Sequence, residues 1–151
     1  MSIEDRLADL GIDLPPVAKP VAAYVPAIQV GDQISTSGQL PLVSGSLPMT
    51  GLVGDQISQG DAAGQARVAA LNALAAAADV AGGVNNIRRV VRVVVYVAST
   101  ADFTAQPAVA NGASELFGEI FGDAGRHIRS AIGVASLPPG APVKVELTVQ
   151  V

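Results

Sequence analysis

The segment IRRVVRVVVYVAS, residues 87–99, limits the folds open to this chain more than any other stretch. Valines occupy both alternating faces, and β-branched residues of this kind favour extended backbone. A strand with two apolar faces is typical of the centre of a sheet that is covered on both sides. The segment therefore predicts a central strand, with helices over one face of its sheet.

Two long apolar segments on either side of this strand have the pattern of helices. The first, residues 58–83, begins with a capping box and ends at paired glycines. Within it Gln65, Asn72 and Asp79 recur every seven residues, which predicts one solvated face. The second helix is predicted to begin near Pro107, and a short helix is predicted over residues 2–10.

The remaining extended segments predict the rest of the sheet. Residues 21–30 and 33–38 are predicted as short strands around a turn, and residues 43–54 as a Gly/Ser/Pro loop. Residues 127–151 are predicted as two strands that the turn SLPPGAP joins into a hairpin. The order ββ(β)αβαββ predicts an α+β fold, a mixed β-sheet with two α-helices packed on one face.

The two final strands carry opposite charges among apolar residues. Side chains alternate between faces, so Ile128 is expected toward the helices and Arg129 away from them. In a hairpin Arg129 and Glu146 then share the face away from the helices, about 5–8 Å apart. This pair is either a solvated ion pair or a pocket for a small anion, because a guanidinium matches a carboxylate as a planar fork. Both alternatives stay open on spacing alone.

Composition excludes several kinds of function. The chain has 151 residues, 50% hydrophobic and 15% charged, which favours one folded, self-associating domain. A net charge of −4 argues against a nucleic-acid partner, and no segment is apolar enough to predict a membrane span. Without cysteine and with only His127, the sequence predicts no metal site and no Ser-His-Asp arrangement. The absence of cysteine and of a signal peptide fits a cytoplasmic protein.

Three motifs resemble one known family. The segments IRSAIGVASLP and VKVEL, with TSGQLPL upstream, are similar to those of the RidA (YjgF/UK-type) family, also called endoribonuclease L-PSP. The resemblance covers residues 20–151, a single RidA-like domain, and leaves residues 1–19 as an N-terminal extension with a short helix. It implies a chorismate-mutase-like fold and a homotrimer whose sheets face inward, with clefts between subunits. It also implies hydrolysis of enamines and imines such as 2-aminoacrylate to 2-oxo acids and ammonia, with no cofactor.

The resemblance also implies roles for single residues. Arg129 matches the family arginine that grips the substrate carboxylate, and Glu146 matches the glutamate that activates water. Ala131 stands where the family often has cysteine, and alanine suffices there if only the backbone carbonyl is used. This difference, the N-terminal helix and the enlarged 43–54 loop suggest a divergent branch. The implied substrate-binding residues are Tyr24, Ser37, Gly38, Asn111 and Ala131.

Plainer readings stand beside these roles. Tyr24 can pack at a strand edge, Ser37 can stabilise a turn, and Asn111 can face solvent. His127 shares a face with Arg129 by alternation, but it can equally be a strand-end residue without a chemical role. Three functions follow: an imine deaminase, a non-catalytic trimer that binds small carboxylate metabolites, and an endoribonuclease, against which the acidic charge speaks.

Overall fold

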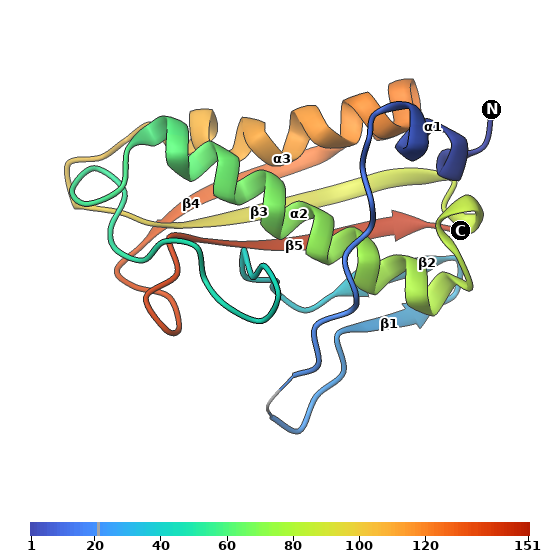
Figure 1. Cartoon of the computed structure of the whole chain (residues 1–151), viewed down its shortest axis with the longest axis horizontal. Helices are drawn as coiled ribbons and strands as arrows, with labels where there is room; N and C mark the ends of the chain where they lie inside the picture. The colour runs from blue at the N-terminus through green and yellow to red at the C-terminus, as the bar shows by residue number, and fades with distance from the viewer. Residues whose placement is uncertain (21) are drawn as a thin grey trace.

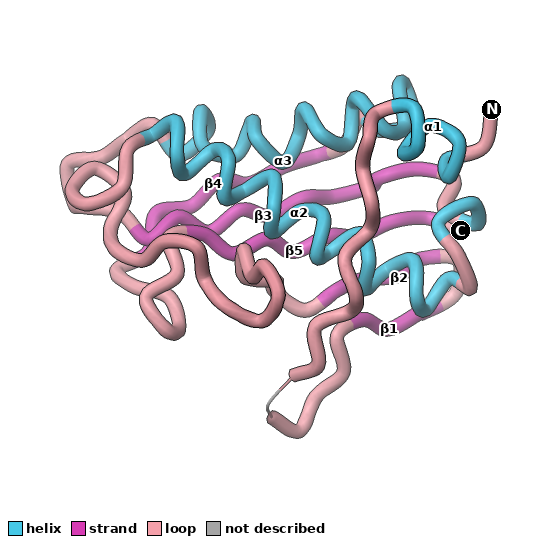
Figure 2. The backbone as a smooth tube through the Cα atoms, in the orientation of Figure 1, coloured by secondary structure: helices cyan, strands magenta, loops and turns pink. Residues whose placement is uncertain are grey.

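One mixed sheet of five strands carries the helices on one of its faces (Figures 1 and 2). The structure is a computed structural model that describes residues 1–20 and 22–151. Helix α2 crosses the sheet diagonally, α3 runs beside it, and α1 lies at the end where the two termini meet (Figure 1). The elements are α1 (Ile3–Asp9), β1 (Ala27–Val30), β2 (Gln33–Thr36), α2 (Gln59–Ala81), η1 (Val84–Asn86), β3 (Arg89–Ala98), α3 (Gln106–Phe121), η2 (Gly122–Gly125), β4 (Ile128–Val134) and β5 (Val143–Gln150).

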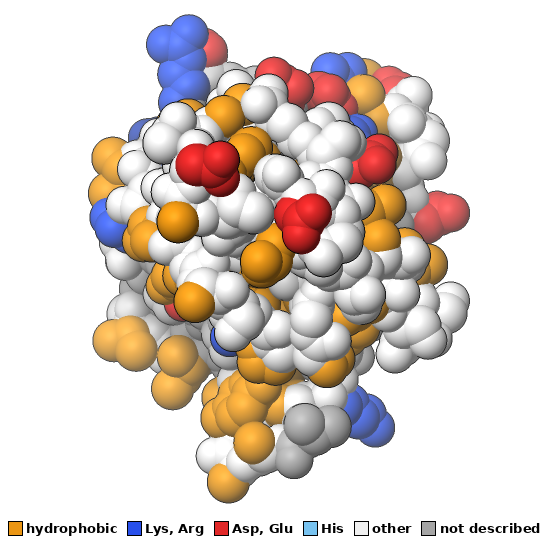
Figure 3. Space-filling model, turned by 90° about the vertical axis from the view of Figure 1, so that its left-hand side faces the viewer, with side chains coloured by type: hydrophobic (Ala, Val, Ile, Leu, Met, Phe, Trp, Pro, Cys, Tyr) orange, Lys and Arg blue, Asp and Glu red, His pale blue; other side chains and the backbone are white. Residues whose placement is uncertain are grey.

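The predicted α+β class and the predicted helices are confirmed. Strand β1 is shorter than predicted: it begins at Ala27, while the predicted start at residue 21 lies outside the described residues. Residues 43–54 form a loop with isolated bridges only. Residues 22–26, just before β1, lie below the sheet (Figures 1 and 2), and their exposed side chains include Tyr24 and Val25. Hydrophobic side chains also gather at the lower end of the space-filling view (Figure 3).

The predicted hairpin of the last two strands is wrong. The sheet order is β1-β2-β5-β3-β4, so β3 lies between β4 and β5. Strand β4 runs parallel to β3 because α3 carries the chain back to the same end of the sheet, as a parallel crossover requires. Strand β5 then pairs antiparallel with the other edge of β3 and with β2. The linker 135–142 thus crosses from one side of the central strand to the other.

The register overturns the predicted common face of Arg129 and Glu146. Val93 pairs with both Arg129 and Leu147, whereas Val94 pairs with Glu146 on one side and with Ser130 on the other. Paired residues share a face, and Val93 and Leu147 are buried beneath the helices. Arg129 therefore belongs to the helix-covered face and Glu146 to the other face, called the open face below.

As a consequence, the two alternating sets of side chains on β4 lie on the opposite faces from those predicted. Ile128 and Ile132, predicted to cover the helices, lie on the open face with 60% and 42% of their surface exposed. The helix-covered side of β4 carries Arg129 and the small residues Ala131 and Gly133. Alternation along β4 is as predicted, and only its direction is reversed.

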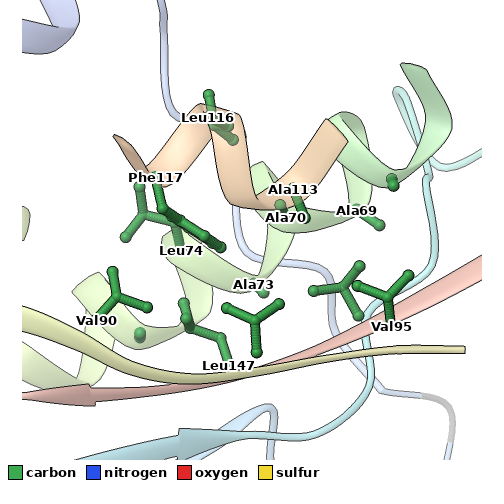
Figure 4. Close-up of a cluster of buried hydrophobic side chains, with 14 of the residues drawn as sticks. Ala69, Ala70, Ala73, Leu74, Val90, Val95, Ala113, Leu116, Phe117 and Leu147 are labelled. Carbon is green, nitrogen blue, oxygen red and sulfur yellow. The ribbon is translucent and has the colours of Figure 1, made fainter. Parts of the chain in front are cut away.

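The core is built from small aliphatic residues between the sheet and two closely packed helices (Figure 4). Alanines of α2 and valines of β3 meet around Leu74 and Phe117, both fully buried. At the α2–α3 crossing, a side chain on Gly112 would overlap the backbone carbonyl of Ala63. The low aromatic content thus lets the two helices approach at backbone distance.

The predicted solvated face of α2 is wrong at two of its three positions. Gln65 and Asn72 are buried, and only Asp79 is exposed. Asn72 Nδ2 donates hydrogen bonds to the carbonyl oxygens of Leu40 and Leu42, 2.9 and 3.0 Å away. The buried amide thus provides hydrogen-bond donors for the backbone carbonyls of a loop that packs on the helix. Buried backbone outside helices and strands needs such side-chain partners.

The N-terminal helix is anchored to the rest of the chain. Ser2 and Asp5 form a capping box, and Leu7 is buried in the main core. Arg6 Nε donates to the carbonyl of Glu119 at 2.8 Å. The boundary between an extension 1–19 and a domain 20–151 stays a prediction.

Candidate functional site

Arg129 reaches from the edge strand β4 to helix α3. Its Nη1 donates to Asn111 Oδ1 at 2.8 Å and to Ser114 Oγ at 3.2 Å. Asn111 and Ser114 stand three positions apart on α3 and so lie on one side of the helix. The plainer alternative, that Asn111 only faces solvent, is wrong in this respect. Two elements thus hold one end of the guanidinium.

The guanidinium of Arg129 borders a cavity of about 520 Å³ at the end of α3. A guanidinium has five N–H donors, and the two of Nη1 are engaged by α3. Among the residues that the structure describes, Nε and Nη2 make no hydrogen bond and Arg129 makes no ion pair. These donors can bind a carboxylate as a fork. The lining residues are Ser114, Gly118, Gly122, Asp123, Gly125, Arg126, His127 and Arg129.

Tyr24, Ser37 and Gly38 meet at a second, smaller cavity of about 160 Å³. Ser37 Oγ donates to the carbonyl of Pro26 at 3.3 Å and accepts from Gln39 Nε2 at 3.2 Å. A side chain at Gly38 would overlap the methylenes of Lys144, so this lysine crosses the backbone there. The sequence assigned these three residues to one substrate site together with Asn111, Ala131 and Arg129, whereas within one chain they line a cavity separate from that of Arg129.

Glu146 lies on the open face, where Tyr96 contacts it. The Tyr96 hydroxyl donates to Glu146 Oε1 at 3.0 Å. Burial, and then this hydrogen bond, raise the pKa of the Tyr96 phenol. Tyr96 is therefore protonated at neutral pH and serves as a donor. The second carboxylate oxygen has no hydrogen bond to any described residue and remains available for water.

Within one chain the predicted site residues fall into separate groups. Asn111 and Arg129 are together, with Ala131 half-buried two positions further along the same face of β4. Glu146 lies on β5, and no ion pair joins it to Arg129 anywhere in the described chain. The solvated Arg–Glu pair is thus wrong as well, because β3 and the thickness of the sheet separate the two groups.

Three residues join the site that sequence reasoning left out or set aside. Ser114 had a signal, since it follows Asn111 by three positions on a predicted helix. Tyr96 was discoverable as the one aromatic residue in a strand of valines. For His127 the sequence left two alternatives, a residue on the face of Arg129 and a strand-end residue without a role, and the structure supports the first because its Nε2 lies 2.9 Å from Ser114 Oγ.

Other concave surfaces carry none of the predicted site residues. A wider cavity of about 670 Å³ lies between α1, the segment 12–17 and the end of α2. In the part of the chain that is described, no three potential metal ligands cluster. No helix there combines the length and apolarity needed to cross a bilayer.

Comparison with known proteins identifies the family. Residues 4–148 match the family model described as "YjgF/chorismate_mutase-like, putative endoribonuclease". The chain belongs to the YjgF/RidA family. Both the chorismate-mutase-like fold and the resemblance of the motifs are thereby confirmed, and the family model includes most of the N-terminal segment.

Similar proteins come from bacteria and a protozoan. A crystal structure named a putative endoribonuclease, from Shewanella oneidensis, is 32% identical with a TM-score of 0.95, covering 100% of both chains. The protein Atu1372 of Agrobacterium tumefaciens, of unknown function, is 41% identical with a TM-score of 0.89, covering 99% of this chain and 92% of its own. Protein TCP17 of Trypanosoma cruzi is 40% identical over 146 residues, 96% of this chain and 91% of its own.

Proposed function

We propose that this protein hydrolyses small enamines and imines of the 2-aminoacrylate class to 2-oxo acids and ammonia, at clefts between copies of the chain. The observation that carries the proposal is Arg129, which lines an open cavity and whose Nη1 is held by α3 while Nε and Nη2 make no hydrogen bond to any described residue. A planar fork of this kind suits a single carboxylate. The family resemblance supports the same role for this arginine.

The position of Glu146 requires a second copy. Arg129 and Glu146 lie on opposite faces within one chain, so they act on one substrate only across an interface. The open face supports such contact, because it exposes aliphatic side chains that a partner can cover. Ile28, Val30, Ile128 and Ile132 on the sheet are 58%, 72%, 60% and 42% exposed. We propose the trimer of the family, with one copy supplying Arg129 and its neighbour supplying Glu146.

The chemistry needs one anchor and one proton-transferring group. Arg129 binds the carboxylate and orients the imine carbon, while Glu146 takes a proton from water as its oxygen attacks that carbon. Glu146 passes that proton to the imine nitrogen, which gives a carbinolamine. Glu146 then takes the carbinolamine hydroxyl proton and returns it to the amino group, so that the C=O bond forms as the C–N bond breaks and ammonia leaves a 2-oxo acid. Tyr96 holds Glu146 Oε1, which leaves Oε2 toward the water.

A second function uses the same arginine without turnover. Because the guanidinium is positioned within one chain, carboxylate binding needs no contribution from Glu146. A trimeric protein that binds small carboxylate metabolites is therefore the alternative, with Ala131 in place of the family cysteine as its support. The endoribonuclease name of relatives is not transferred here, because the chain has a net charge of −4.

One assay separates these two functions. Purified protein is given 2-aminoacrylate, generated in place by a lyase, and ammonia and 2-oxo acid are measured against the spontaneous rate. Accelerated release that Arg129→Ala abolishes supports the deaminase. Thermal stabilisation by pyruvate that Arg129→Ala abolishes, without accelerated release, supports the binding protein.

A further inference from the structure

The single histidine of the chain stands at the end of a hydrogen-bond chain that reaches Arg129. His127 Nδ1 lies 2.6 Å from the carbonyl oxygen of Gly125, and Nε2 lies 2.9 Å from Ser114 Oγ. A carbonyl oxygen only accepts, so Nδ1 carries the proton. In neutral His127, Nε2 then accepts from the Ser114 hydroxyl, and Ser114 Oγ in turn accepts from Arg129 Nη1. The donor and the acceptor of each hydrogen bond from Gly125 to Arg129 are thereby assigned.

The end of this hydrogen-bond network that lies away from Arg129 is held by the core. A side chain at Gly125 would overlap the backbone carbonyl of Phe117, so η2 packs directly against α3 and holds the accepting carbonyl in place. The His127 ring also packs edge-on against fully buried Phe117, with 6.1 Å between the ring centroids and 87° between the planes. The orientation of His127 is thus set by packing as well as by its hydrogen bonds.

The hydrogen bonds from His127 through Ser114 have a direct consequence for Arg129. An arginine side chain loses considerable rotamer freedom when it binds a ligand, at a free-energy cost that weakens binding. Ser114 and Asn111 together engage both N–H groups of Nη1, so part of that freedom is already lost before a ligand arrives. Arg129 is thus held by α3 at the cavity that it lines.

We infer that His127 and Ser114 are positioning residues, which hold Arg129 in the orientation that binds a small carboxylate, with His127 in its Nδ1–H tautomer. The inference rests on the proposed role of Arg129 and deepens it. Both residues line the same cavity as Arg129, and the role inferred for them is exerted through the guanidinium.

The first test measures binding and turnover in Ser114→Ala. Loss of the hydroxyl frees one N–H of Nη1, and both the Kd for pyruvate and the KM for the imine are expected to rise about three- to tenfold. The value of kcat stays within about twofold, because the water-activating group is unaffected. Ser114→Thr retains a hydroxyl and is expected to restore Kd. Unchanged Kd in a folded Ser114→Ala protein overturns the inference.

The second test reads His127 directly in the wild-type protein. Because the chain has one histidine, ¹⁵N-edited NMR gives one set of imidazole signals. The expected signature is a protonated Nδ1 and an unprotonated Nε2, and these signals should shift when pyruvate binds. An Nε2–H tautomer, or signals indifferent to saturating pyruvate, contradicts the inference even if Ser114→Ala fails to fold.

The two tests separate this inference from the proposed function. Absence of imine turnover, together with pyruvate binding that depends on Arg129 and Ser114, sinks the deaminase and leaves the positioning role intact. Normal turnover with no effect of Ser114→Ala on KM or Kd supports the deaminase and overturns the positioning role. If neither imine turnover nor pyruvate binding depends on Arg129, both proposals fail.

Discussion

Arg129 and Glu146 lie on opposite faces of the sheet, on strands that β3 separates. Arg129 is bound to α3 on the covered face, and Glu146 is bound to Tyr96 on the open face. A single copy therefore presents two incomplete halves of the proposed site. Self-association is a requirement of the proposed chemistry rather than an addition to it.

Complementation between two inactive variants is the first prediction. Arg129→Ala and Glu146→Gln should each lose most imine hydrolysis when expressed alone. Co-expression of the two should restore activity, because some clefts receive an intact Arg129 from one copy and an intact Glu146 from its neighbour. Random mixing gives native residues at about a quarter of the clefts. The measurement is ammonia release by co-purified, differently tagged chains.

The control for complementation is the double variant carrying both substitutions, co-expressed with itself. It has no intact cleft and should stay inactive. Mixed oligomers that form but show no recovered activity would mean that the two residues do not meet across an interface.

The phenol of Tyr96 should ionise at higher pH than an ordinary tyrosine. Burial and Glu146 raise its pKa. The pKa of Tyr96 is higher in the folded protein than in the unfolded chain. The contribution of its protonated phenol to folding stability is therefore complete below the ordinary tyrosine pKa, and it is lost as pH rises through the pKa of the folded protein. Tyr24→Phe leaves Tyr96 as the only tyrosine, so phenolate absorbance reports it alone.

Adding Glu146→Gln to that background should lower the titration midpoint part of the way. The substitution removes the negative charge, while burial, the larger cause, remains. A midpoint that Glu146→Gln leaves unchanged would show that the carboxylate does not contact the phenol in solution.

Two glycines of α3 should respond oppositely to alanine. Gly112→Ala should lower the free energy of unfolding by about 1–3 kcal/mol, because the added methyl group overlaps the α2 backbone at Ala63. Gly118→Ala meets no atom within 4 Å and should raise it by about 0.5–1 kcal/mol through helix propensity. Urea unfolding of both variants checks the pair. Equal effects would contradict the close crossing.

The buried amides of α2 form a second matched pair. Asn72→Ala leaves the carbonyls of Leu40 and Leu42 without their donor and should cost about 1–3 kcal/mol. Gln65 is equally buried, but its Oε1 has no partner among the described residues. Gln65→Met should therefore change stability by less than about 1 kcal/mol. Thermal unfolding of the two variants decides, and a larger loss for Gln65→Met would refute the assignment.

The sequence by itself determined the elements and their local pattern. Capping residues, glycine stops and β-branched runs act over a few positions, so α2, α3 and β3 were predictable. The motifs around Arg129 and Glu146, together with TSGQLPL, indicated the family. The solvated face of α2 was mispredicted because the loop that covers Asn72 is distant in sequence.

Only the tertiary structure decided which way each strand faces. Alternation along β4 and β5 is local, but the direction of each alternating set depends on the partner strand. The crossover through α3 placed β4 and β5 on opposite sides of β3, which separated Arg129 from Glu146. It also brought Ser114 to the guanidinium and His127 to Ser114, contacts that depend on how α3 packs against the start of β4.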